Sequence, residues 1–175
     1  MTALLDTHVL VWWLDDRQRL SGAQRGVVAS ASPESPLLVS DVSLWEVAML
    51  HDLGRIRLAI PLREWLDRAT SPPLVRRQGI SPAIAAAVTD LPDSFHRDPA
   101  DRILVATARV LGATLLTQDR RIIDAGLVDV LALIPPCPAA EPVAGTSREG
   151  RRRAHPAVRA SPRQPPDCRA VAAAR

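Results

Sequence analysis

The chain has 175 residues, a hydrophobic fraction of 47% and a net charge of +3, which suits one ordinary domain with a core. All 22 basic residues are arginines, so chemistry that needs a lysine, such as a P-loop or a Schiff base, is excluded. The two cysteines lie beyond residue 136, and neither a signal peptide nor a membrane span is expected, which predicts a cytoplasmic protein without a disulfide framework.

The first predicted element is a short buried strand, followed by a turn and a helix. Ala3, Leu4 and Leu5 form an apolar run that stops at Asp6, and helical periodicity resumes over 9–15. Ligands of open parallel sheets bind at the carboxyl ends of strands. Asp6 is therefore expected at that edge, either as the N-cap of the helix or as a functional carboxylate.

Strands and helices continue to alternate along the chain. The expected elements are, in order, a helix over 22–31, a strand over 37–40, a helix from a cap at Asp41 or Ser43 to about 52, a helix over 61–69 with Pro61 at N1, a weak strand over 74–80, helices over 82–91 and 99–111, and strands over 113–117 and 127–134. For the helix over 99–111, Asp98 is the expected N-cap and Gly112 the stop. This alternation predicts a three-layer α/β/α fold with a central parallel sheet.

The charge divides the chain into two parts. Residues 1–134 carry 14 Arg and 16 acids, a balance of −2, whereas residues 135–175 carry 8 Arg and 3 acids, a balance of +5. The second part also holds 8 of the 16 prolines and lacks Leu, Ile, Phe and Trp. We therefore expect a folded domain over 1–134 and a disordered tail over 135–175.

Four acidic residues are candidates for a functional site, and each has a structural alternative. Asp6 and Asp119 follow strands and would otherwise cap helices, while Asp101 lies in the first turn of a helix, where its charge favours the helix dipole. Glu46 would otherwise be a surface residue, but its apolar neighbours make an unpaired carboxylate there costly. If the strands before Asp6 and Asp119 are neighbours at a topological switch point, both acids face one crevice.

Several carboxylates in one pocket repel one another unless protons or cations neutralise them. Hard oxygen ligands favour Mg²⁺, with Mn²⁺ as a substitute. Zinc is disfavoured, because the four histidines form no cluster with ligand spacing. Such a site suits in-line attack of a metal-activated water on a phosphodiester.

Four motifs in this order carry a resemblance to a known family. They are LLDTHVLVWWL over 4–14, SLWEVAM over 43–49, RDPADR over 97–102 and TLLTQDRR over 114–121. With them, the chain over about 3–134 resembles a PIN-domain ribonuclease of the VapC toxin type. It departs from that pattern at Ala100, where the family often has an aromatic residue, and in the tail beyond Pro136.

The resemblance implies a metal-dependent endoribonuclease that leaves 5′-phosphate and 3′-hydroxyl ends. It also implies the toxin of a type II toxin–antitoxin pair, homodimeric and held inactive by a small antitoxin. The family's acidic quartet maps onto Asp6, Glu46, Asp101 and Asp119, with Asp6 and Asp101 as the principal Mg²⁺ ligands. Glu46 would hold metal or orient the attacking water, and Asp119 would complete the site or serve a second ion.

Other assignments stay open from the sequence alone. Thr7 and Thr117 would place hydroxyls near a bound water or phosphate, or would pack at strand ends, and Trp12 and Trp13 would stack on bases or pack in a core or dimer interface. Arginines near the motifs would bind RNA phosphates, remain solvated or pair with Asp98 and Asp119; they are Arg55, Arg57, Arg97, Arg102, Arg120 and Arg121.

Two alternatives compete with the nuclease. One is a catalytically inactive PIN-like module that binds RNA or an antitoxin peptide. The other is a phosphoryl-accepting receiver-type domain, but this expects paired acids after the first strand and a lysine, and the chain has neither.

Overall fold

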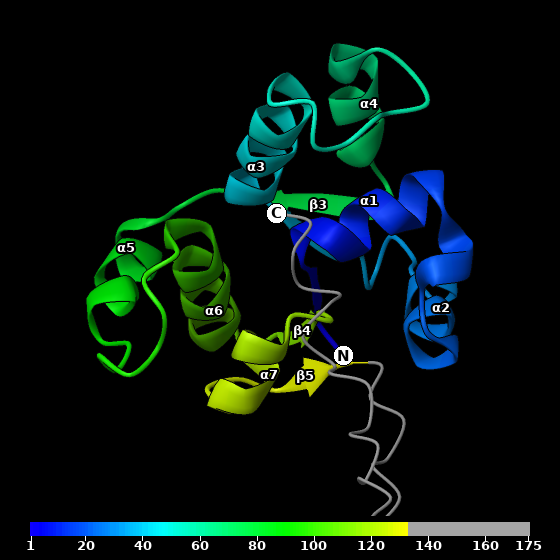
Figure 1. Cartoon of the computed structure of the whole chain (residues 1–175). Helices are drawn as coiled ribbons and strands as arrows, with labels where there is room; N and C mark the ends of the chain where they lie inside the picture. The colour runs from blue at the N-terminus through cyan, green and yellow to red at the C-terminus, as the bar shows by residue number, and fades with distance from the viewer. Residues whose placement is uncertain (133–175) are drawn as a thin grey trace, which may run out of the picture. The chain divides into compact units, whose positions relative to one another are not determined.

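Five parallel strands form the centre of the protein in the computed structural model, which describes residues 1–132 (Figure 1). The strands are β1 (Ala3–Leu5), β2 (Leu37–Ser40), β3 (Val75–Gln78), β4 (Thr114–Leu116) and β5 (Val130–Leu131). Their order in the sheet is β3-β2-β1-β4-β5, and every neighbouring pair is parallel. The chain therefore changes direction between β1 and β4, which confirms the predicted switch point. The tail expected over 135–175 lies outside the described residues.

Seven α-helices connect and follow the strands within residues 1–132. They are α1 (Thr7–Asp15), α2 (Gly22–Ala29), α3 (Asp41–Asp52), α4 (Leu62–Ala69), α5 (Pro82–Thr89), α6 (Pro99–Leu111) and α7 (Arg120–Ala125), with a single 3₁₀ turn, η1 (Arg17–Arg19), after α1. None of these helices combines the length and hydrophobicity of a membrane span. The predicted α/β/α fold with a central parallel sheet is confirmed.

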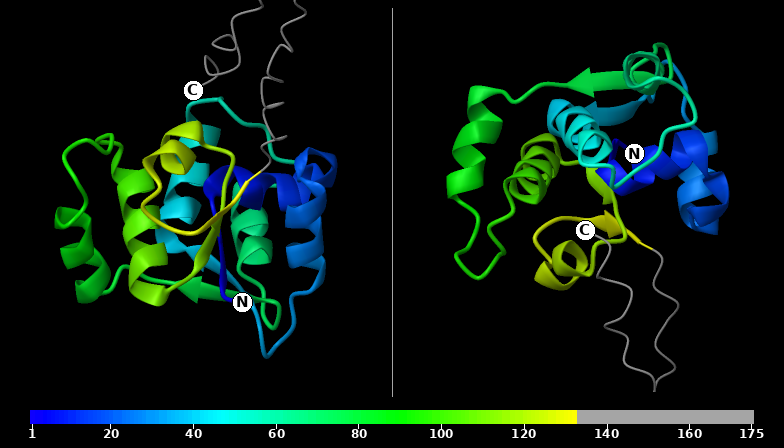
Figure 2. Two further views of the ribbon diagram at one scale, coloured as in Figure 1. Left: turned by 90° about the horizontal axis from the view of Figure 1, so that it is seen from below. Right: turned by 45° about the horizontal axis from the view of Figure 1, so that its top comes forward.

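The two faces of the sheet supply two separate cores, because side chains alternate along each strand. Leu5, Leu37 and Val39 face one core, to which α1 and α4 contribute, whereas Leu4 and Leu38 face the other, to which α6 and α7 contribute. Figure 2 shows α5 and α6 on one side of the sheet and α1 and α2 on the other. This arrangement fixes the carboxyl ends of β1 and β4 between two layers of helices.

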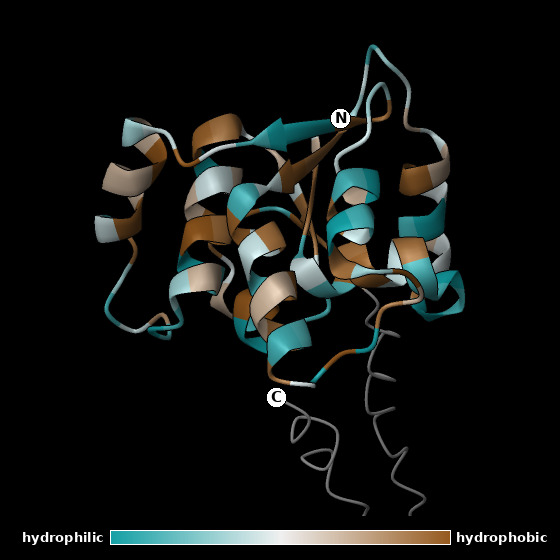
Figure 3. Ribbon diagram, turned by 90° about the horizontal axis from the view of Figure 1, so that it is seen from above, coloured by the Kyte–Doolittle hydropathy of each residue, from teal (hydrophilic) through white to brown (hydrophobic). Residues whose placement is uncertain are grey.

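The edge strand β3 is polar, as its hydrophilic colouring in Figure 3 shows. Its sequence is Val-Arg-Arg-Gln, and Arg77 forms a salt bridge of 2.8 Å with Asp41 at the start of α3. Charged side chains on an edge strand discourage pairing with strands of other molecules. The weakly predicted strand over 74–80 is therefore real, and it occupies the sheet's exposed edge.

Helix ends follow the predicted capping chemistry in most places. Asp98 accepts hydrogen bonds from the backbone N–H groups of Ala100 and Asp101, and Gly112 ends α6 with φ 57°, as predicted. For α3 the predicted cap was wrong, because the Ser40 hydroxyl accepts the hydrogen bond from the Val42 N–H.

Three other boundaries also differ from the prediction. Pro61 has an extended ψ of 139° and so precedes α4 as its N-cap. The helix α1 starts two residues earlier than expected, at Thr7, and within residues 1–132 the last strand covers 130–131. Trp13 is buried in the core, which decides its assignment in favour of packing.

Candidate active site

Asp6 stands at the carboxyl end of β1 and is almost fully buried, with 2% of its surface exposed. It occupies the N-cap position of α1, but its side chain makes no capping hydrogen bond. Instead its Oδ2 accepts a hydrogen bond from the Thr117 hydroxyl, and its Oδ1 lies 3.9 Å from Nδ1 of His8. Capping thus does not account for this carboxylate, whose cost of burial needs another explanation.

Glu46 approaches the same edge of the sheet from the middle of α3. Its Oε2 accepts a hydrogen bond of 2.8 Å from the Thr7 hydroxyl, at the start of α1. The predicted reason for its importance was partly wrong, because Trp45 and Met49 are 57% and 40% exposed and do not enclose it. The Glu46 side chain is half-buried by its contact with α1, not by its own sequence neighbours.

Asp101 lies in the first turn of α6 and is 3% exposed. Its Oδ2 is hydrogen-bonded to Nε2 of His96 at 2.7 Å, and it accepts a second hydrogen bond of 3.0 Å from Nη2 of Arg121. The helix-dipole position expected for this residue is real, but the side chain is held by two partners outside the helix.

Asp119 follows β4 and caps α7, since its Oδ1 accepts a hydrogen bond of 2.8 Å from the Arg121 N–H. The guanidinium of Arg121 also reaches back to this carboxylate, with Nη2 2.8 Å from Oδ2. The same Nη2 bonds to Asp101, so one arginine joins two of the four predicted acids. Asp119 therefore caps α7 and also shares an arginine with Asp101.

Burial and mutual repulsion disfavour the charged forms of two of these groups. Burial raises the pKa of the Glu46 carboxyl, and the nearby charges of Asp6 and Asp101 raise it further. Burial likewise raises the pKa of Asp101, with added repulsion from Asp6, Asp98 and Asp119. The charges of Asp6 and Asp101 act on Glu46, and those of Asp6 and Asp119 act on Asp101, so the four sequence-predicted acids lie near one another at this edge.

These pKa shifts predict how stability depends on pH when no divalent ion is bound. A raised carboxyl pKa means that the folded state holds more protons than the unfolded state, so this contribution to stability is lost as the pH rises above about 4.3. In EDTA, Glu46→Gln should therefore flatten the decrease in the free energy of unfolding between pH 4 and 7, measured by urea denaturation. The same substitution at the fully exposed Glu34, whose pKa is lowered by hydrogen bonding with Ser32, should not flatten it.

Comparison with known proteins connects this geometry to a family. Residues 3–127 match the PIN domain. The chain belongs to the PIN-domain family. It is 44% identical over 121 residues to Ribonuclease VapC22 of Mycobacterium tuberculosis (strain ATCC 25618 / H37Rv), a match that covers 69% of this chain and 89% of that protein. The resemblance to VapC-type PIN domains is thus confirmed.

Solved structures agree with this PIN-domain fold. VapBC2 from Rickettsia felis, bound to a DNA fragment from its promoter, has a TM-score of 0.58 at 13% identity and covers 75% of this chain and 98% of its own. VapC20 of Mycobacterium tuberculosis, a toxin that cleaves the sarcin-ricin loop, has a TM-score of 0.56 at 18% identity, covering 74% and 98%. FitAcB from Neisseria gonorrhoeae has a TM-score of 0.53 at 23% identity, covering 74% and 96%. At these identities the structures support the fold alone.

The donor set of this PIN domain suits a hard cation. Asp6, Glu46 and Asp101 contribute carboxylate oxygens, and hydroxyl groups of threonines orient the first two. Within residues 1–132 no three His, Cys, Asp or Glu side chains converge closely enough to form a finished metal site. Mg²⁺ commonly uses one or two protein carboxylates and fills its other positions with water or phosphate, so the residues present fit it.

Sequence reasoning missed the contacts of two residues near the site. His96 was considered only as a zinc ligand and rejected, yet it is bonded directly to Asp101. For Arg102 the sequence leaves RNA phosphate, solvent or an acidic partner open, but its guanidinium donates to backbone carbonyls of α5 and of the loop before α6, including 3.0 Å to Val88 O and 3.3 Å to Phe95 O. His96 precedes α6 and Arg102 lies in its first turns. Their closeness to the strongly capped start of this helix is the one feature of the sequence that could have identified them.

Proposed function

We propose that this PIN domain is a metal-dependent endoribonuclease that hydrolyses RNA phosphodiester bonds as the toxin of a type II toxin–antitoxin pair. The observation that supports this most directly is the placement of Asp6, Glu46, Asp101 and Asp119 at the switch point between β1 and β4. A relative at 44% identity carries the name ribonuclease. Several buried carboxylates at one sheet edge do not stabilise a fold, because they repel one another. They are, however, good ligands for a metal ion that also binds a substrate phosphate.

Asp6 and Asp101 would hold Mg²⁺, or Mn²⁺ in its place, with Asp119 completing the site. The bound ion would supply Lewis-acid activation of water and stabilisation of the charge that develops on the phosphate. Thr117 and Thr7 orient Asp6 and Glu46 by hydrogen bonds, which limits the rotation of both carboxylates. Glu46 would orient the attacking water, with its Oε2 held by the hydrogen bond from the Thr7 hydroxyl.

Arg121 forms salt bridges with two of these acids, Asp101 and Asp119. Its Nε and Nη2 are used by Asp101 and Asp119, whereas Nη1 donates to no described residue. Arginine presents its donors in a planar fork that suits phosphate. We therefore assign Nη1 to a phosphate oxygen of the RNA backbone.

A small antitoxin is the proposed protein partner, in a homodimeric, cytoplasmic toxin. Solved neighbours include a toxin–antitoxin complex from Klebsiella pneumoniae, with a TM-score of 0.52. An exposed apolar stripe along α3 and its C-cap also supports a protein partner, because Trp45, Met49 and the C-cap residue Leu53 recur every fourth residue and are 57%, 40% and 58% exposed. Apolar groups gathered on one helix face commonly mark interaction surfaces.

The proposal predicts discrete cleavage of RNA that depends on a divalent ion. Purified full-length protein, free of antitoxin, should create new 5′-phosphate ends in total cellular RNA with Mg²⁺ or Mn²⁺ and none with EDTA, as mapped by sequencing of 5′ ends. Divalent-ion binding measured by calorimetry serves as an independent readout. Folded protein that yields no new ends and binds the ion only weakly would favour the inactive module that binds RNA or an antitoxin peptide.

A further inference from the structure

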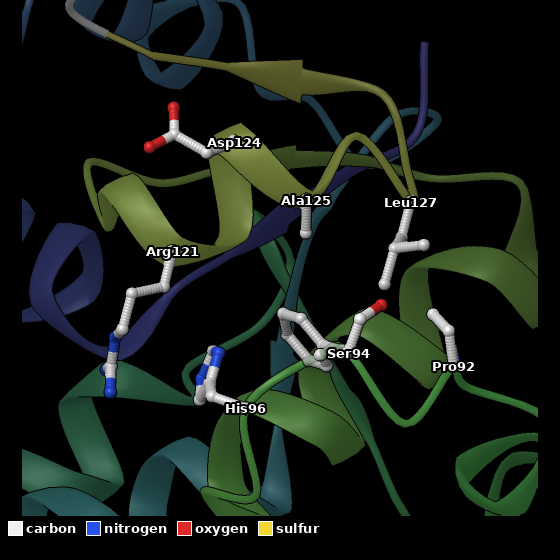
Figure 4. A pocket seen from close by; sticks show the side chains of 8 residues that line it. Pro92, Ser94, His96, Arg121, Asp124, Ala125 and Leu127 are labelled. Carbon is white, nitrogen blue, oxygen red and sulfur yellow. The ribbon is translucent and has the colours of Figure 1, made fainter.

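A cavity of about 480 Å³ lies beside the candidate active site, between the loop before α6 and helix α7 (Figure 4). The loop side is formed by Ser94, Phe95 and His96, and the α7 side by Arg121, Ala125 and Leu127. Its volume is within the range of about 300–1,000 Å³ that small-molecule sites occupy. The role assigned to the four carboxylates does not use this space.

The cavity is adjacent to the carboxylates of the candidate active site. Two of its lining residues, His96 and Arg121, are bonded directly to the buried carboxylate of Asp101, at 2.7 and 3.0 Å. In Figure 4 their side chains lie next to each other on one side of the cavity. A phosphate bound at Arg121 would therefore be adjacent to Asp101, and the group attached to that phosphate would extend into the cavity.

The lining of the cavity suits a flat ring with polar edges. The half-buried His96 ring lines one side of the cavity and packs on the buried Phe95 ring, 4.2 Å away between centroids, and Ala125 and Leu127 supply aliphatic surface on the other side. The Ser94 hydroxyl points towards Leu127 across the cavity, whereas the carboxylate of Asp124 points away from it. Bases bind to such surfaces by stacking and apolar contact, with a few polar groups at their edges.

We propose that this cavity, the base pocket, holds the nucleobase of a nucleotide that flanks the scissile phosphodiester. Arg121 bonds the phosphate, the Phe95–His96 side and the aliphatic side enclose the ring, and the Ser94 hydroxyl contacts its edge. This inference rests on the proposed ribonuclease function and adds a determinant of sequence preference to it. A side chain of a protein partner is the competing occupant, and the test separates the two.

Binding is measured first, without cleavage. Full-length protein in EDTA is titrated with AMP, GMP, CMP, UMP, the four nucleosides and inorganic phosphate, and the methyl NMR signals of Ala125 and Leu127 are followed. At least one nucleotide should shift both signals saturably, whereas inorganic phosphate alone should not. Ala125→Phe, which fills the base pocket, should weaken that binding by at least about tenfold. Ala29→Phe is the matched control, because Ala29 is also the last residue of a helix and is exposed.

Cleavage-site sequencing then tests the role of the base pocket in the reaction. Ala125→Phe should change the base preferred beside the cut and raise KM more than it lowers kcat. If this variant unfolds, Ser94→Trp on the exposed loop blocks the same space and carries the test. The base pocket would be overturned if the blocking variant cleaved RNA at unchanged sites and with an unchanged KM. It would also be overturned if that variant lost antitoxin binding but kept nucleotide binding. Nucleotide binding that persists in a protein unable to cleave RNA would instead overturn the nuclease and leave the pocket standing.

Discussion

Asp101→Asn should lower RNA cleavage by at least about 100-fold, the scale typical of removing one group that stabilises charge in a transition state. The substitution keeps the shape of the side chain and removes the charge of a carboxylate that is only 3% exposed. It also leaves an oxygen to accept the hydrogen bond from Arg121. Because burial and neighbouring charges already raise the pKa of Asp101, the metal-free variant should be at least as stable as the wild type.

Asp98→Asn is the matched control, because it makes the same chemical change three residues earlier. Asp98 caps α6, and asparagine caps helices as well as aspartate does, so this variant should keep both its stability and its cleavage rate. The comparison uses initial rates on one RNA and thermal unfolding in EDTA. Equal losses of cleavage rate in the two variants would show that cleavage depends on the local negative charge and not on metal binding by Asp101.

The fold was predictable because the signals that define it are local. The apolar run before Asp6 and the helix between its cap at Asp98 and its stop at Gly112 are each marked by neighbouring residues in the sequence. Their alternation along the chain is enough to predict a parallel sheet. The last strand starts later than expected, because within the described part of the run over 127–134 the residues paired with β4 are 130 and 131.

The candidate site was predictable only in part, because its contacts join residues that are far apart in the sequence. Asp6 and Asp119 could be placed from strand ends, but the hydrogen bond from Thr117 to Asp6 spans 111 residues and leaves no trace in spacing. The structure gives different outcomes for two of the arginines. Arg121 does pair with Asp119, as one alternative held, whereas Arg102 is occupied by backbone carbonyls. Such partners depend on tertiary packing alone.

Arg102→Ala should destabilise the protein by about 2–3 kcal/mol, which lowers Tm by about 5–10 °C for a domain of this size. Its guanidinium donates to the carbonyl of Val88 in the last turn of α5 and to three carbonyls in the segment between α5 and α6. The distances are 3.0 Å to Val88, 3.4 Å to Leu91, 3.3 Å to Phe95 and 3.5 Å to His96. It also lies over the Phe95 ring, 6.0 Å from the centroid. Without it, these carbonyls lose a charged donor, and the segment that carries His96 loses its anchor.

Arg109→Ala is the control for loss of an arginine, because Arg109 is an exposed residue of the same helix and should cost little. Arg102→Lys keeps the charge but replaces the fork of five donors by a single ammonium, so it should recover only part of the lost stability. Since the anchored segment holds His96 against Asp101, Arg102→Ala should also lower cleavage by about 10–100-fold at temperatures where the variant remains folded. Full cleavage by a destabilised variant would mean that Asp101 keeps its orientation without His96, and that the 91–96 segment serves the base pocket alone.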